Sequence, residues 1–186
     1  MKYPGTRVMT FCGDSWDKGD MRSMPRSERS GGPRTSVGLW LRAGLRGDNE
    51  DYRRLARTLN HGQKGWNDDE PAVVAAACEM AVRRFFATYR HVPVEEFVTD
   101  MCERIAKERA PSPQVDMEAV IRAALNENSD VPLDIKRGEL LRIRGAITAN
   151  ITDILKLNAD AIDDFVAEAE TVAIARGYSP PPAFAP

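Results

Sequence analysis

Several kinds of residue and segment are scarce in this sequence, and each scarcity narrows what the protein can be. Aromatic residues make up 7% of the 186 residues, so a hydrophobic core must consist mostly of aliphatic side chains and alanine. No apolar run approaches the roughly 20 residues that a membrane-spanning helix needs. The first 20 residues contain three aspartates and no sustained apolar stretch, unlike a secretory signal peptide. We therefore expect a cytoplasmic protein that does not insert into a membrane.

Cysteine and histidine are also few. The three cysteines, Cys12, Cys78 and Cys102, are too widely spaced for a disulfide framework. The two histidines, His61 and His91, form no metal-ligand spacing with them. The stretch "SGGPRTS" lacks the spacing of a phosphate-binding loop. These absences predict a non-enzymatic protein without a metal or a cofactor, and an enzyme whose site is assembled from distant residues is the alternative.

The residues that are present predict a helical domain. Apolar residues make up 42% of the chain and recur every three or four positions from residue 36 onward, as on one face of a helix. No segment alternates with the period of a β-strand. We expect an all-α fold, a compact bundle of about seven helices ending in an antiparallel helical hairpin. The expected helices span about 36–46, 48–61, 68–90, 93–109, 114–126, 133–157 and 159–177.

Local signals place some of the helix ends and one central helix. Thr35 or Ser36 can cap the first helix, Gly47 can end it, and Asp48 can cap the second. The third helix is apolar on most sides, which is typical of a helix in the middle of a bundle.

The chain divides into three parts. Residues 1–35 are expected to form a disordered basic arm, because glycine, proline, serine and arginine there offer little to bury. Residues 36–178 form the helical domain, and residues 179–186 are a proline-rich tail. Methionines at positions 1, 9, 21 and 24 leave the start of translation open.

Charge is distributed unevenly around a net of −2. Residues 21–64 hold ten basic and four acidic groups, whereas residues 65–186 hold thirteen basic and twenty-one acidic groups. A basic segment next to an acidic body is typical of a phosphate-binding arm, or of a segment that folds back or binds another copy.

An arginine series forms the candidate nucleic-acid-binding site, since a guanidinium group can hold two phosphate oxygens. Its members are Arg22, Arg26, Arg29, Arg34, Arg42, Arg46, Arg53, Arg54 and Arg57. A solvated arm with a surface helix face is the alternative, and codon usage in a GC-rich genome would also raise the arginine count. On the last helix, Asp160, Asp164 and Glu168 align at steps of four, which indicates a solvated face rather than a metal site.

The expected 133–157 helix offers a candidate seam for a partner helix, because apolar residues recur there every seven positions, with one further isoleucine between them. Its members are Leu133, Leu140, Ile147, Ile151 and Ile154. The protein's own helices are the alternative occupants of this seam. Together these features favour a non-enzymatic protein-interaction or regulatory protein that binds another protein or itself. The alternative is nonspecific phosphate binding to nucleic acid through the arm and second helix.

Overall fold

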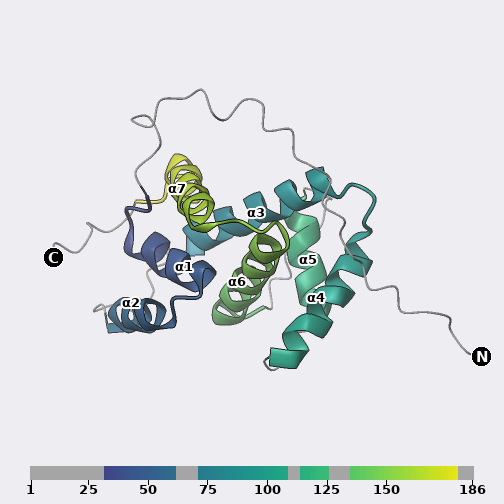
Figure 1. Cartoon of the computed structure of the whole chain (residues 1–186), viewed down its shortest axis with the longest axis horizontal. Coiled ribbons are helices and arrows are strands. Elements are labelled where there is room, and N and C mark those ends of the chain that lie inside the picture. Colours follow the sequence, from purple (N-terminus) through teal and green to yellow (C-terminus); the bar gives the residue numbers. More distant parts are fainter. Residues whose placement is uncertain (1–31, 62–70, 109–113, 126–134, 180–186) are drawn as a thin grey trace, which may run out of the picture.

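The computed structural model describes residues 32–61, 71–108, 114–125 and 135–179, and all regular structure in this part is α-helical (Figure 1). The all-α prediction is confirmed: the described residues contain seven helices and no strand. The helices are α1 Ser36–Arg46, α2 Asn49–His61, α3 Pro71–Thr88, α4 Val94–Glu108, α5 Gln114–Ala124, α6 Arg137–Ile154 and α7 Ala159–Ala175.

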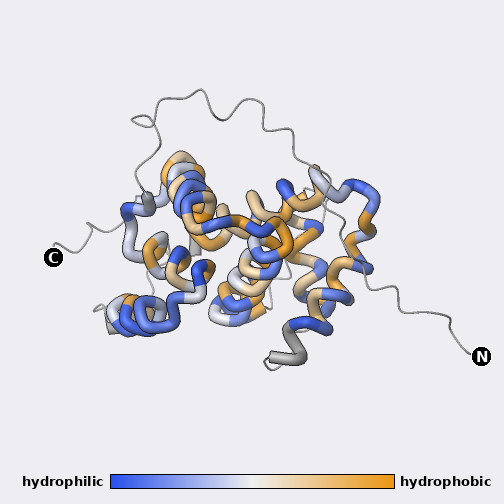
Figure 2. The backbone as a smooth tube through the Cα atoms, in the orientation of Figure 1, coloured by the Kyte–Doolittle hydropathy of each residue, from blue (hydrophilic) through white to orange (hydrophobic). Residues whose placement is uncertain are grey.

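Helix α3 lies at the centre of the bundle, as its composition predicts. It contacts α1, α5, α6 and α7, and apolar residues around its circumference are inaccessible to solvent. Val73, Val74, Ala77 and Val82 are all 0% exposed. Figure 2 shows apolar segments gathered where the helices meet and polar segments on the outer turns. Four helices thus pack on α3, which brings residues that are far apart in the sequence close together in space.

Helices α6 and α7 are joined by a short turn, as expected for a hairpin, but they diverge from it. Each packs mainly on α3 rather than along the other (Figure 1). Helix α6 is shorter than the expected 133–157 span. Asn158, which lies between the two expected spans, caps α7 by accepting the Ala161 N–H at 2.9 Å. Between them Lys156 adopts a left-handed conformation, with φ 51°, that reverses the chain.

Aromatic side chains hold α4 against the C-terminal end of α3. The Phe85 and Phe97 ring centroids lie 4.4 Å apart, and Phe86 meets Phe97 edge-on at 5.6 Å. Such pairs contribute about 0.5–1.5 kcal/mol beyond the area they bury. Phe85, Phe86 and Phe97 therefore anchor α4 on this end of α3.

Helix α2 lies at the edge of the bundle and packs on α1. Gly47 ends α1 in the left-handed region, with φ 72°, and Asp48 accepts the Asp51 N–H, so both sequence predictions are confirmed. Trp40 of α1 stacks on Tyr52 of α2 with ring centroids 5.2 Å apart. The polar side of α2 consequently faces away from the body of the protein.

A buried carboxylate joins the start of α1 to α7. Glu170 is 4% exposed and accepts hydrogen bonds from the Arg34 N–H, the Thr35 N–H and the Thr35 hydroxyl, at 2.8, 2.8 and 2.6 Å. The Thr35 hydroxyl in turn accepts the Gly38 N–H and caps α1, as predicted. Residues 32–35, which we call the entry segment, were expected to belong to a disordered arm but lie packed against α7, with Pro33 buried.

We predict that Gly38→Ala destabilises the fold by about 2–4 kcal/mol, because charge-assisted bonds to a buried group are costly to lose. A Cβ at Gly38 would lie 1.9 Å from Glu170 Oε1 and would displace the carboxylate. Denaturant unfolding monitored by circular dichroism measures the change.

Gly145→Ala is the matched control, since a Cβ at this helical position of α6 meets nothing within 4 Å. It should stabilise the fold by up to about 1 kcal/mol, the helix-propensity difference between glycine and alanine. Equal effects of the two substitutions would contradict the role assigned to Glu170.

Candidate functional site

The structure separates the arginine series into groups with different surroundings. Arg22, Arg26 and Arg29 lie outside the described residues. Arg34 is exposed and Arg42 is half-buried. The structure therefore does not bring the whole series together on one described surface.

Two of these arginines have carboxylate partners within the protein. Arg46 Nη2 lies 2.6 Å from Asp163 Oδ1 and 2.9 Å from the Ala159 carbonyl oxygen, which ties the C-terminal end of α1 to the beginning of α7. Arg54 pairs with Asp51 at 2.7 Å, within α2. Their charges are largely neutralised locally, so they are less available to an external anion.

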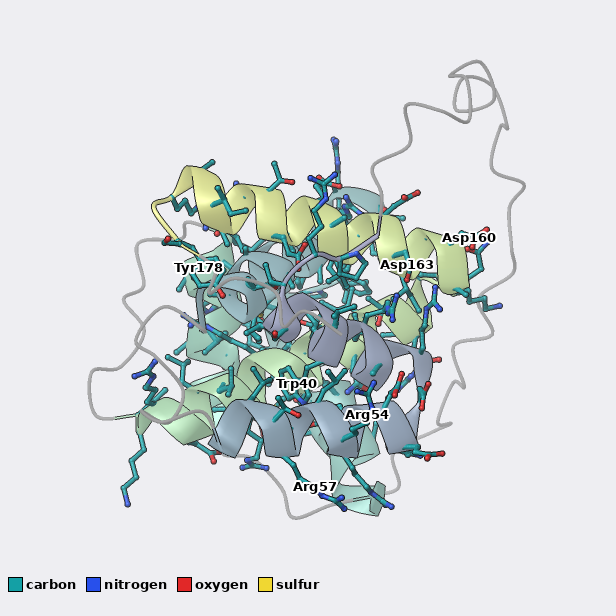
Figure 3. The ribbon with its side chains drawn as sticks, turned by 90° about the vertical axis from the view of Figure 1, so that its left-hand side faces the viewer. Trp40, Arg54, Arg57, Asp160, Asp163 and Tyr178 are labelled. Atoms are coloured by element: carbon teal, nitrogen blue, oxygen red, sulfur yellow. The ribbon has the colours of Figure 1, made fainter. Side chains whose placement is uncertain are left out.

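Arg53 and Arg57 differ from these two. Both are exposed on α2, one turn apart, and neither has a hydrogen bond or an ion pair with any described residue. Figure 3 shows Arg57 directed away from the body of the protein, on the side of α2 that does not face α1. We call Arg53 and Arg57 the α2 basic face.

Carboxylates of α7 lie on the opposite side of the protein. Asp160 and Asp164 are exposed and have no bonded partner among the described residues, and we call them the α7 acidic face. Glu168, expected to be solvated with them, is exposed and pairs with Arg84, whose guanidinium lies 5.2 Å from the Phe165 ring centroid. In Figure 3 the labelled Asp160 lies at the end of α7, at the upper right, whereas Arg57 points outward from α2 at the bottom. Within one copy, no described bond joins the basic face to the acidic face.

The candidate seam lies mainly inside the bundle. Ile147 and Ile151 are 0% exposed, and Leu140 and Ile154 are half-buried. Leu133 lies outside the described residues. Helix α6 packs closely on α3, so this chain's own helix covers the middle of the seam.

Glu170 is the residue whose role the sequence analysis missed. It follows Ile162 and Val166 at steps of four, within the stripe that faces the core, so a carboxylate occupies an inward position. A buried acid at such a position needs donors, and the uncapped amides at the start of a helix supply them. The sequence shows an acid at an inward position, but it does not show that the donors lie 135 residues away, at the start of α1.

The cysteine and histidine side chains do not converge on a site in the described part of the chain. Burial raises the pKa of the Cys78 thiol to about 12, against the opposing effects of Arg144 and a hydrogen bond with Thr148. His91 is exposed in the α3–α4 turn. Across the described ranges, no three His, Cys, Asp or Glu side chains are grouped so as to hold a metal ion.

Comparisons with known proteins do not assign the chain to a family. No family model matches it, and neither a curated protein nor a solved structure does. None of the described helices combines the length and apolar character that crossing a bilayer requires.

We predict that Cys78 is unreactive in the folded protein, because the thiolate is the nucleophile and burial disfavours it. In a Cys12→Ser background, an aromatic disulfide reagent at pH 8 should modify half-buried Cys102 and leave Cys78 unmodified until denaturant is added. Adding Cys102→Ser should abolish the native-state reaction. Rapid native-state modification in that double variant would contradict the placement of Cys78.

Proposed function

We propose that this chain is a non-enzymatic helical protein that acts by binding another protein, with a second copy of itself as the simplest partner. The observation that carries the proposal is the pair of exposed, oppositely charged faces on α2 and α7. Each consists of two like charges one turn apart, without partners among the described residues. Two copies can bring the faces together, whereas within one copy Asp160 lies at the end of α7 and Arg57 on the outer side of α2 (Figure 3).

The remaining described surface favours an electrostatic rather than an apolar contact. Only two large hydrophobic side chains are exposed there, Val115 at 74% and Ile174 at 49%, and they lie on different helices. Because the middle of the α6 seam is covered by α3, coiled-coil pairing through it would require the bundle to open. Charge complementarity instead sets orientation and association rate at modest cost.

The test is light scattering coupled to size-exclusion chromatography. At about 50 mM salt we expect a concentration-dependent mass above that of one chain, and at about 500 mM salt the mass of one chain, since salt screens exposed charges. The double substitution Arg53→Glu/Arg57→Glu should abolish the association at low salt.

The matched control is Arg90→Glu/Arg104→Glu, which makes the same change in net charge at exposed positions elsewhere. This variant should associate more strongly than the α2 variant. A single-chain mass at every salt concentration would exclude self-association, and equal loss in both variants would exclude the α2 basic face as the contact.

Nonspecific nucleic-acid binding is a second candidate function, favoured by the same two partner-free arginines. Exposed guanidinium groups at helical spacing can contact successive phosphates, and the arginines at 22, 26 and 29 would extend the contact along the backbone. This candidate requires only the basic face, whereas self-association requires both faces.

We predict that duplex binding, if this candidate is correct, weakens steeply between about 50 and 200 mM salt, because each phosphate contact releases a counterion. Arg53→Glu/Arg57→Glu should lower the affinity and the salt slope together, as fluorescence anisotropy can measure. Asp160→Asn/Asp164→Asn should leave both unchanged or raise the affinity. Undetectable binding at low salt to both duplex and single strands would reject this function.

A further inference from the structure

We propose that the arginine-rich segment preceding the entry segment docks in cis on the α7 acidic face, with Arg26 and Arg29 against Asp160 and Asp164. The inference goes beyond the proposed function, because it concerns a contact within one chain and requires neither a second copy nor nucleic acid. Among residues 1–35, the structure describes only the entry segment, residues 32–35.

The entry segment runs along α7 in a defined direction. Its last residue, Thr35, is bonded to Glu170, and its first residue, Gly32, lies beside Asp163, where an added Cβ would be 3.6 Å from Oδ2. Seven residues of α7 separate these two points, about 10 Å along the helix axis. An extended chain of three residue steps covers that distance.

The entry segment, followed from Thr35 back to Gly32, points toward the beginning of α7. Passing from Thr35 back to Gly32, the chain moves from Glu170 toward Asp163, and one further turn of α7 leads to Asp160. Residue 29 lies three positions before Gly32, so its Cα can be at most about 10 Å away. An extended backbone is therefore long enough for Arg29 and Arg26 to contact the α7 acidic face without any change in the anchored residues.

Charge complementarity favours the arginine-rich segment as the ligand of the α7 acidic face. The segment 22–31 contains three arginines and one glutamate, whereas α7 contains five carboxylates and no basic residue. Three of these carboxylates are engaged: Asp163 with Arg46, Glu168 with Arg84, and Glu170 with the entry segment. Asp160 and Asp164 are the two left without a described partner, and they lie where the chain enters.

In this arrangement the arginine-rich segment competes with an external partner for the carboxylates of Asp160 and Asp164. A segment that covers Asp160 and Asp164 shields them from a second copy, and its own arginines are then withheld from phosphate. An external partner must displace a tethered competitor, and the displacement depends on salt because the contact is exposed.

The experiment measures disulfide closure in the full chain, in a Cys12→Ser/Cys102→Ser background that keeps only buried Cys78. One pair, Ser27→Cys with Ala159→Cys, reports docking toward the acidic face. The control pair, Ser27→Cys with Thr171→Cys, tests the other direction along α7. Both helix positions are exposed. Along the axis of α7 they lie about 6 Å and about 12 Å from Asp163, beside which Gly32 lies, and five residues can span roughly 17 Å.

At about 50 mM salt we expect the Ala159 pair to close about five- to tenfold faster than the Thr171 pair, corresponding to two exposed ion pairs. The ratio should fall at about 1 M salt and in the Asp160→Asn/Asp164→Asn variant, to the lower value that the direction of the anchored chain sets by itself. A rate independent of protein concentration shows that closure occurs within one chain.

Two outcomes would overturn the proposal: a ratio near one at low salt, or a ratio that the two asparagine substitutions do not change. Neither depends on light scattering or nucleic-acid binding, so failure of the proposed function is distinguishable from failure of this contact. Asp160 and Asp164 are exposed, and their replacement is not expected to prevent folding, which circular dichroism checks.

Discussion

The carboxylate of Glu170 is the interaction on which the arrangement of the first and last helices depends. A charge that is 4% exposed must have its oxygens satisfied, and here two backbone amides and one hydroxyl do so. The same donors stand at the start of α1, where the helix dipole also favours an anion. Gly38 leaves the space that this geometry requires, and Arg46 fixes the other end of α1 to α7. Both charged surfaces are held in place by this pair of helices: α2 packs on α1, and the acidic face belongs to α7.

The parts of the fold that local sequence determines were predictable. Gly47 and Asp48 mark helix ends through chemistry confined to a few neighbouring residues, and the centrality of α3 follows from its own apolar circumference. The course of α6 and α7 was less predictable. A short link suggests a hairpin, but the choice between packing on each other and packing on α3 depends on surfaces contributed by the whole chain. The periodicity of a helix shows which of its faces is apolar. It does not show which other helix packs on that face.

The candidate sites illustrate the same limit at the level of single residues. Arg46 and Arg53 look equivalent in the sequence, because both lie on polar positions of neighbouring helices. In the structure Arg46 is bound to Asp163, 117 positions later, whereas Arg53 meets no described carboxylate. Ile147 and Ile151 likewise satisfied the spacing of a partner seam, and only the position of α3 shows that their side chains are covered within the chain. The sequence therefore identified residues of a suitable type for a binding site. Long-range packing determined which of them remain exposed to a partner.

The long separation between Thr35 and Glu170 has a consequence for synthesis on the ribosome. The amides that open α1 leave the exit tunnel well before their acceptor has been translated. With 135 residues between them and elongation at about 5–20 residues per second, the delay is on the order of 10 s. During that interval the beginning of α1 has only its own threonine as a cap. The contact between the start of α1 and Glu170 therefore cannot form until α7 has emerged.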